Sequence, residues 1–283
     1  IDWAGYVPPK PSFLGTRVFD NWSLEELSGY IDWTPFFQTW EMKGRYPAIL
    51  DDPAQGAAAR QLWADAQDML GKIIAEKWFR PRAVVGLWPA HAVGDDIRLY
   101  TGEDRSEALA TFFTLRQQRA KRVGHPNVAL SDFVAPETPD YLGAFVVTAG
   151  MADATIAERF ERANDDYSAI LVKALADRFA EAFAERMHEH VRRELWGYAP
   201  DEHFTAEELV SEPYRGIRPA AGSPAQPDHT EKATLFRLLD ATAATGVELT
   251  ESFAMWPASS VSGLYLSHPE SYYFGVAQVE RDQ

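Results

Sequence analysis

Residues 83–100, AVVGLWPAHAVGDDIRLY, predict a β-hairpin. Residues 83–88 form a continuous β-prone run, Gly94-Asp95-Asp96 is typical of a turn, and residues 97–100 match a returning strand. Further strands are expected at 111–115, 141–148, 254–266 and 272–279. Because these strands do not alternate with helices as βαβ units, we expect an α+β domain with a largely antiparallel sheet.

Much of the remaining chain has helical periodicity. A helix of about 25 residues is expected after Asp51 and Asp52, which are plausible caps, with Pro53 at its first position. Further helical patterns lie at 23–28, 153–196, 205–210 and 230–244. The run Asn164-Asp165-Asp166 could divide the longest of these into two helices.

Residues 1–50 differ from the rest of the chain because they are rich in aromatic residues and proline. We expect this segment to wrap as an arm around a body of sheet and helices formed by residues 51–283. Residues 1–283 would then form one domain.

The composition is that of an acidic globular protein. Of the 283 residues 46% are hydrophobic, enough to fill a core, and the formal net charge is −15. Such a chain lacks the basic surface that attracts nucleic acids and anionic membranes, so neither is an expected partner. The longest nearly apolar run, residues 141–152, is too short for a membrane-spanning helix.

The chain contains no cysteine and begins with Ile1. The absence of cysteine excludes disulfides, thiolate metal ligands and a cysteine nucleophile. It also fits a reducing compartment, so a cytoplasmic location is expected. The N-terminus lacks the pattern of a signal peptide, and we expect the chain to be an excised part of a longer protein.

Familiar catalytic motifs are absent from the sequence. It has no G-x-S-x-G elbow, phosphate-binding P-loop or G-x-G-x-x-G fingerprint. His188 and His190 lie about 200° apart on a helix and cannot bind one metal ion from one face. His91 with Asp95 and Asp96 could ligate a hard cation, but a hairpin turn favours Gly-Asp anyway. We therefore assign no catalytic residue and no metal ligand.

The segment from Gly216 to Pro224, GIRPAAGSP, is more informative. Apart from Arg218 its side chains are small, so a flat ligand could lie against the backbone and bond to its N–H and C=O groups. Arg218 would offer a planar fork to a carboxylate or phosphate. The alternative is an ordinary surface loop with a solvated arginine.

Two carboxylates are further candidates. Asp32 stands in the aromatic run IDWTPFF (31–37), where a carboxylate is costly unless it is paired or faces a cation. Glu181 lies about 200° around its helix from the stripe that contains Phe179 and Phe183, so by itself it reads as a solvated glutamate.

These and other segments resemble the C-terminal activation domain of cobalamin-dependent methionine synthase. The similarity runs through nearly the whole chain, and its longest strings are VVGLWPAHAVGDD (84–96), VKALADRFAEAFA (172–184), YRGIRPAAG (214–222) and TESFAMWPASSVSG (250–263). Shorter matches are IDWTPFF (31–37), LSDFVAP (130–136), WGYAP (196–200), HTEKA (229–233) and SHP (267–269).

The resemblance implies a C-shaped α+β domain that binds S-adenosylmethionine (AdoMet) and presents its methyl group to cobalamin on a neighbouring domain. In the family, an electron from flavodoxin or a similar reductase and a methyl group from AdoMet restore methylcobalamin from the inactive cob(II)alamin. This repair supports methionine synthesis from homocysteine and methyltetrahydrofolate.

The resemblance also implies roles for individual residues. The family motif R-x-x-x-G-Y falls on Arg218 and Gly222, so Arg218 is expected on the AdoMet carboxylate. The backbone of Pro219, Ala220, Ala221 and Gly222 is expected along the adenine. Other matching ligand-contacting positions are Asp32, Glu181, Tyr273 and Phe274.

The sequence departs from the family pattern at two of these positions. Ser223 stands where the family usually has tyrosine, which removes a ring that could stack or hydrogen-bond. Phe274 lacks the hydroxyl of a tyrosine common there. The runner-up hypothesis is therefore a non-catalytic interaction module that kept the fold but lost AdoMet binding.

A third hypothesis is a stand-alone metal hydrolase built on His91, Asp95 and the region of His188. If the family function holds, the acidic chain needs a local basic surface to dock an acidic reductase. The densest basic run comprises Arg116, Arg119, Lys121 and Arg122, and a second candidate comprises Arg192 and Arg193.

Overall fold

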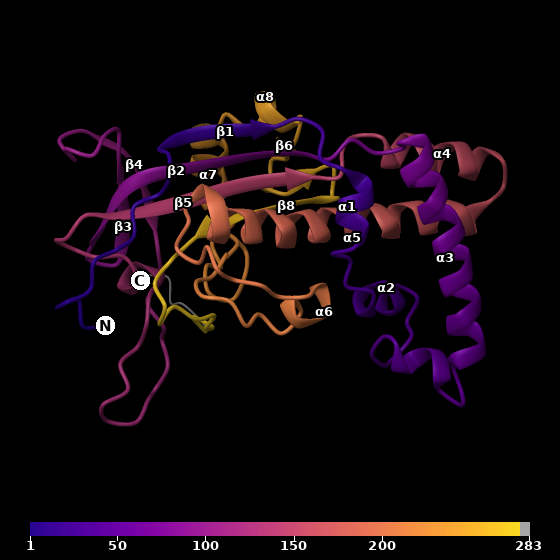
Figure 1. Cartoon of the computed structure of the whole chain (residues 1–283), viewed down its shortest axis with the longest axis horizontal. Helices are drawn as coiled ribbons and strands as arrows, with labels where there is room; N and C mark the ends of the chain where they lie inside the picture. The colour runs from indigo at the N-terminus through magenta and orange to yellow at the C-terminus, as the bar shows by residue number, and fades with distance from the viewer. Residues whose placement is uncertain (278–283) are drawn as a thin grey trace.

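A six-stranded antiparallel sheet lies at the centre of the computed structural model, which describes residues 1–277 (Figure 1). The strand order is β4-β3-β2-β5-β8, and β1 also pairs with β2. The strands are β1 (Gly15–Phe19), β2 (Arg82–Val93), β3 (Asp96–Tyr100), β4 (Ala108–Phe113), β5 (Asp140–Thr148) and β8 (Ser260–Tyr265). Two short strands, β6 (Glu248–Leu249) and β7 (Met255–Trp256), form a separate ribbon.

Strand β2 organises the sheet because three strands pair with it. β5 pairs along most of its length, β1 pairs with residues 83–87 and β3 with residues 90–93. Trp88 and Pro89 lie between the β1 and β3 pairings. Proline has no N–H to donate to a neighbouring strand, so Pro89 suits a position where neither β1 nor β3 pairs with β2.

Both faces of the sheet are buried. On β2, Val85 and Leu87 belong to one apolar cluster, whereas Val84 and Trp88 belong to the other. The first cluster also contains the buried sides of α3 (Gly56–Glu76) and α5 (Asp166–His190), and the second those of α7 (Glu231–Leu239). Burial on both sides explains why the central strands are apolar throughout rather than alternating.

Helix α5 is the main support of the first face. Its N-cap Asp165 accepts a hydrogen bond from the Ser168 N–H (3.0 Å). Six of its buried residues are alanines, and the larger side chains of Phe179, Phe183 and Met187 are completely buried. It continues into a π-helical turn, η3 (Val191–Leu195), before the chain turns away at Gly197.

The remaining helices are short or lie at the ends of the sheet. They are α1 (Leu24–Ser28), α2 (Thr34–Thr39), α4 (Asp153–Arg162), α6 (Ala206–Leu209) and α8 (Ala241–Thr245), with 3₁₀ turns η1 (Ala48–Asp51) and η2 (Leu130–Phe133). In Figure 1, α3 and the loop 114–129 extend downwards from opposite ends of the sheet, which gives the chain an open, C-shaped outline. None of the helices in residues 1–277 has the length and apolar character needed to cross a bilayer.

The arm formed by residues 1–50 contributes to the same core as the body. It supplies β1 to the edge of β2, and Phe36 and Phe37 are completely buried. At the N-terminal end of the arm, Trp3 packs against His268 with ring centroids 5.0 Å apart, and the Trp196 indole N–H donates to the Pro9 carbonyl (2.8 Å). Strand β1 was not expected from the sequence.

The α+β prediction and the hairpin at 83–100 are confirmed. The break near Asn164 is also confirmed, because α4 ends at Arg162 and α5 begins at Asp166. The helix expected from Asp51 begins later, at Gly56, because the Asp52 carboxylate accepts from the N–H groups of Ala54 and Gln55 and holds a turn there.

Three other expectations were wrong in detail. The strand expected at 111–115 is β4, which ends at Phe113 because its partner Asp96 is the first residue of β3. The helix expected at 230–244 breaks at Asp240, which has a left-handed backbone (φ 47°). Residues 272–277 form no strand; instead the Val276 N–H donates to Pro224 and its carbonyl accepts from Gln118. Residues 278 and 279 lie outside the described part.

Candidate functional site

A cavity of about 310 Å³ lies between α5, α6, the turn before α2 and the end of the loop that carries Arg218. In Figure 1, α2 and α6 lie on the same side of α5. Its charged lining residues are Asp32, Arg178, Glu181, Glu185, Glu212 and Arg218. Four carboxylates and two guanidinium groups give the cavity a negative balance, which favours a ligand that carries positive charge.

The structure therefore brings together Asp32, Glu181 and Arg218, which are far apart in the sequence. The Asp32 carboxylate accepts the Thr34 N–H (3.2 Å) at the start of α2, which fixes its position at the cavity wall. Glu181 is exposed on α5, on the side opposite the buried Phe179 and Phe183.

Arg218 is held by a dense set of contacts rather than solvated. Its Nη2 donates to Glu185 Oε2 (2.9 Å), and its Nη1 lies 3.4 Å from Glu185 Oε1. Nη1 also donates to the Tyr214 hydroxyl (2.9 Å) and lies 3.0 Å from His188 Nδ1. The side chain is 15% exposed. The hypothesis of an ordinary loop with a solvated arginine is thus wrong.

The electrostatics of this cluster keep Arg218 charged and His188 neutral. Burial opposes the charge of Arg218, but Tyr214 and Glu185 outweigh it and raise the pKa of the guanidinium. Burial, together with the charges of Arg192 and Arg218, lowers the pKa of His188 well below its usual value. Because a guanidinium only donates hydrogen bonds, the Nδ1 atom of a neutral His188 must accept.

The loop after Arg218 is fixed to the edge of β8. Ile217 and Leu266 exchange two backbone hydrogen bonds, and the Leu264 N–H donates to the Pro219 carbonyl (2.9 Å). This close approach depends on Gly263, where a Cβ atom would lie 2.7 Å from the Pro219 oxygen. Among the described residues, the N–H groups of Ala220 and Ala221 have no hydrogen-bond partner, so they are available to a ligand.

Tyr273 and Phe274 have different surroundings. The Tyr273 hydroxyl accepts the Arg218 backbone N–H (2.9 Å), so this half-exposed ring lies beside the loop. Phe274 is 9% exposed and packs in the second apolar cluster near Phe133 and Tyr272. The structure therefore does not bring Phe274 to the cavity.

The sequence reasoning missed three charged residues of the cavity. Glu185 lies one helical turn after Glu181, and this spacing would have placed both on one side of α5. Arg178 lies on the preceding turn of the same helix. Glu212 has a left-handed backbone (φ 54°) just before Pro213, and no pattern in the sequence points to it.

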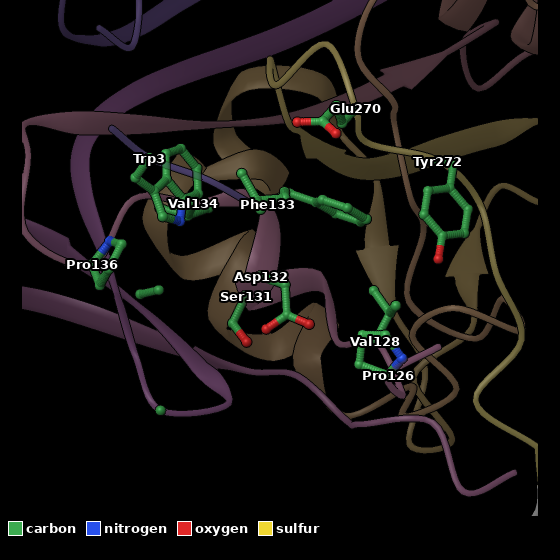
Figure 2. A pocket seen from close by; sticks show the side chains of 13 residues that line it. Trp3, Pro126, Val128, Ser131, Asp132, Phe133, Val134, Pro136, Glu270 and Tyr272 are labelled. Atoms are coloured by element: carbon green, nitrogen blue, oxygen red, sulfur yellow. The ribbon is translucent and has the colours of Figure 1, made fainter. Parts of the chain in front are cut away.

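A second cavity, of about 390 Å³, contains none of the expected ligand-contacting residues. Figure 2 shows the side chains of Trp3, Phe133, Glu270 and Tyr272 around it. The Asp132 carboxylate that also lines it is bound by Arg116 (2.8 Å). We assign no ligand to this cavity.

The metal-hydrolase hypothesis finds no support in the arrangement of these side chains. Within residues 1–277 no three His, Asp or Glu side chains gather in a way that could hold a metal ion. His188 is completely buried beside Arg218, His190 packs against Phe19 and Trp22, and the ring of His91 packs against Tyr100.

Part of the expected basic docking surface is also engaged internally. Arg116 forms ion pairs with Asp95 (2.6 Å) and Asp132, and Lys121 donates to Gln117 and to the Pro126 carbonyl. Arg192 is completely buried and paired with Glu202 (2.7 Å). Arg119 and Arg122 are exposed in the loop 114–129.

Comparison with known proteins agrees with this architecture. A sequence profile of a family described as "Vitamin B12 dependent methionine synthase, activation domain" matches residues 23–283. A solved structure described as "Crystal Structure of the MetH Reactivation Domain bound to AdoHcy" is 54% identical, with a TM-score of 0.97. The match covers 100% of this chain and 87% of that chain. The chain belongs to the family of activation domains of vitamin B12-dependent methionine synthase.

Proposed function

We propose that this chain binds AdoMet in the cavity bounded by Asp32, Glu181 and Arg218 and presents its methyl group to cobalamin carried by another domain of the same enzyme. The observation that carries this proposal is the pairing of a fixed, charged arginine with several carboxylates in one cavity. AdoHcy, which is bound by the solved relative, is what remains of AdoMet after the methyl group has left.

The residue types fit the charged end of AdoMet. Its carboxylate suits Arg218, whose guanidinium is fixed in place and remains charged. Its ammonium and sulfonium groups are cations and suit the carboxylates of Asp32, Glu181 and Glu212 around the same cavity. One positively charged ligand would bring the negative balance of the cavity closer to neutral.

The loop after Arg218 suits the adenine. The unpaired N–H groups of Ala220 and Ala221 can donate to ring nitrogens, and the small side chains let a flat ring approach the backbone. Tyr273 is fixed beside this loop through the Arg218 N–H and provides an aromatic wall.

The task of these residues is to bind, orient and desolvate the methyl donor. Transfer of a methyl group from a sulfonium needs no general base, so the lack of an assigned catalytic residue is consistent with the proposal. When bound, reduced cobalamin supplies the cobalt nucleophile, after an electron from flavodoxin or a similar reductase has brought it to that state. The reaction would restore an enzyme that makes methionine from homocysteine and methyltetrahydrofolate.

Isothermal titration calorimetry of the chain with AdoMet tests the proposal. We expect saturable binding at one site per chain and no methyl transfer until a cobalamin-loaded domain and a reductant are added. Absence of AdoMet binding would favour the non-catalytic module instead. Methyl transfer to a small thiol or amine without cobalamin would contradict the proposed division of labour.

A further inference from the structure

We infer that Glu185 is a positioning residue: it binds the edge of the Arg218 guanidinium that consists of Nη1 and Nη2, and so turns the edge that carries Nε toward the carboxylate of the ligand. This inference rests on the proposed function and assigns a role to a residue that neither the sequence motif nor the family comparison picks out. Its basis is the way in which the hydrogen atoms of Arg218 are distributed among partners.

A guanidinium group can bind a carboxylate through either of two edges. The end edge consists of Nη1 and Nη2, and the side edge consists of Nε and the outer hydrogen of Nη2. In this structure Glu185 meets the end edge, with Oε2 at 2.9 Å from Nη2 and Oε1 at 3.4 Å from Nη1. The end edge is therefore unavailable to a ligand.

Two further contacts fix the same half of the group. Nη1 donates to the Tyr214 hydroxyl (2.9 Å) and to His188 Nδ1 (3.0 Å), so its two hydrogens face three acceptors. His188 is completely buried, and its ring packs against those of Tyr214 and Tyr265 with centroids 4.8 and 5.2 Å away. These aromatic contacts leave the imidazole little freedom to move.

The side edge has no such partners. Nε and the second hydrogen of Nη2 form no hydrogen bond with any residue between 1 and 277, although Arg218 borders the cavity. In Arg192 the corresponding edge is occupied by a carboxylate, because its Nε and Nη2 both donate to Glu202 (2.7 and 2.8 Å). A ligand carboxylate would make the same two-bond contact with Arg218.

Glu185 thus places a second carboxylate on the far side of the guanidinium from the one that the ligand brings. The geometric part of its role needs only an acceptor oxygen, whereas its negative charge opposes a ligand carboxylate. Replacement by glutamine separates these two effects, because the amide keeps one acceptor and loses the charge. Replacement by alanine removes both and frees the arginine to rotate.

The test compares AdoMet with decarboxylated AdoMet, which differs only in lacking the carboxylate. The ratio of their dissociation constants measures how well Arg218 recognises that group, and a general loss of folding changes both constants together. In the unaltered chain we expect decarboxylated AdoMet to bind about tenfold more weakly or worse. Arg218→Ala should bring the ratio close to one.

Glu185→Ala should lower the ratio at least about fivefold, whereas Glu185→Gln should keep it at or above the value of the unaltered chain. Glu161→Ala, the same change at an exposed position of α4, provides the control and should leave the ratio unchanged. A ratio unaffected by Glu185→Ala would overturn the inference, as would a glutamine variant that behaves like alanine. Failure of the unaltered chain to bind AdoMet would instead contradict the proposed function.

Discussion

The imidazole ring of His229 occupies the space that a Cβ atom on Gly222 would need. Gly222 also has a left-handed backbone, with a φ angle of 93°. The ring is held by the buried Lys232, whose ammonium group lies 3.1 Å from His229 Nδ1 and donates to the Phe253 carbonyl. The matching segment HTEKA (229–233) therefore supports the loop that follows Arg218.

We expect Gly222→Ala to destabilise the chain and to weaken AdoMet binding, because the loop must shift to clear the ring. Gly124→Ala is the matched control: Gly124 has a similar φ angle of 86°, but no atom lies within 4 Å of its added Cβ. The control should cost about 1 kcal/mol of unfolding free energy through the backbone alone. Urea denaturation should show a clearly larger loss for Gly222→Ala; equal losses would mean that the contact with His229 yields easily.

The departure at Ser223 leads to a second prediction. The Ser223 hydroxyl oxygen is buried and has no hydrogen-bond partner within the described residues. Ser223→Ala removes this unpaired group, so we expect the unfolding free energy to rise by about 1 kcal/mol with unchanged AdoMet affinity. Thermal unfolding and calorimetry check the two halves. A less stable alanine variant would show that the hydroxyl is satisfied after all.

The same position predicts the outcome of restoring the family tyrosine. Because the hydroxyl oxygen of Ser223 is buried, a ring that extends from this position has to displace its neighbours before it can reach a ligand. We expect Ser223→Tyr to lower the melting temperature and to leave AdoMet binding no tighter than before. Calorimetry that shows several-fold tighter binding would mean that the ring finds the cavity without strain.

Glu231 leads to a prediction about pH. Burial, followed by the charges of Asp228 and Asp96, raises its pKa from 4.5 to about 7. A raised carboxyl pKa means that the folded chain favours the protonated form, so this group contributes less stability as the pH rises from 4.5 through 7. Glu231→Gln keeps an acceptor for the Phe113 N–H but does not titrate.

As the pH rises through that range, the unfolding free energy of the glutamine variant should therefore increase relative to that of the unaltered chain. The difference between the two proteins should change by on the order of 1–3 kcal/mol by pH 8. Urea denaturation at several pH values measures the difference between the two proteins. Glu161→Gln, at an exposed site, should show no such trend. A difference that stays constant between pH 4.5 and 8 would contradict the raised pKa.

The exposed arginines of the loop 114–129 lead to a prediction about docking. If Arg119 and Arg122 attract an acidic reductase, replacing both by glutamate should slow reactivation at low salt, and added salt should narrow the gap. Lys72 and Lys173 are exposed on α3 and α5, and their double replacement by glutamate provides a control of equal charge. Reactivation kinetics at two ionic strengths measure the effect. Equal slowing by both double variants would point to net charge rather than a docking surface.

Local patterns in the sequence predicted the elements that depend on neighbouring residues. The hairpin at 83–100 depends on a β-prone run and a Gly-Asp turn, and the break before α5 depends on the cap at Asp165. Strand β1 was missed because its outward residues are exposed and its pairing partner, β2, lies more than sixty residues later. Non-local pairing of this kind leaves little trace in a short window of sequence.

In the site, too, features that depend on neighbouring residues were predictable from the sequence, whereas contacts between distant segments were not. Arg218 stood out because it is the one charge among small residues, but its partners Glu185, His188 and Tyr214 come from a helix and a loop that the sequence could not bring together. Arg116 and Arg192 illustrate the converse. Both read as surface charges in the sequence, and both are held by carboxylates that only the fold places beside them.

The cavity joins parts of the chain that are remote in sequence, since Asp32 lies in the arm and Arg218 near the other end. A molecule bound by both residues would connect the first and last quarters of the polypeptide. Its binding energy would then add to the cohesion of the whole fold by mass action. Local unfolding of the aromatic arm would consequently be rarer in the liganded protein than in the free one, and proteases would cleave the arm more slowly.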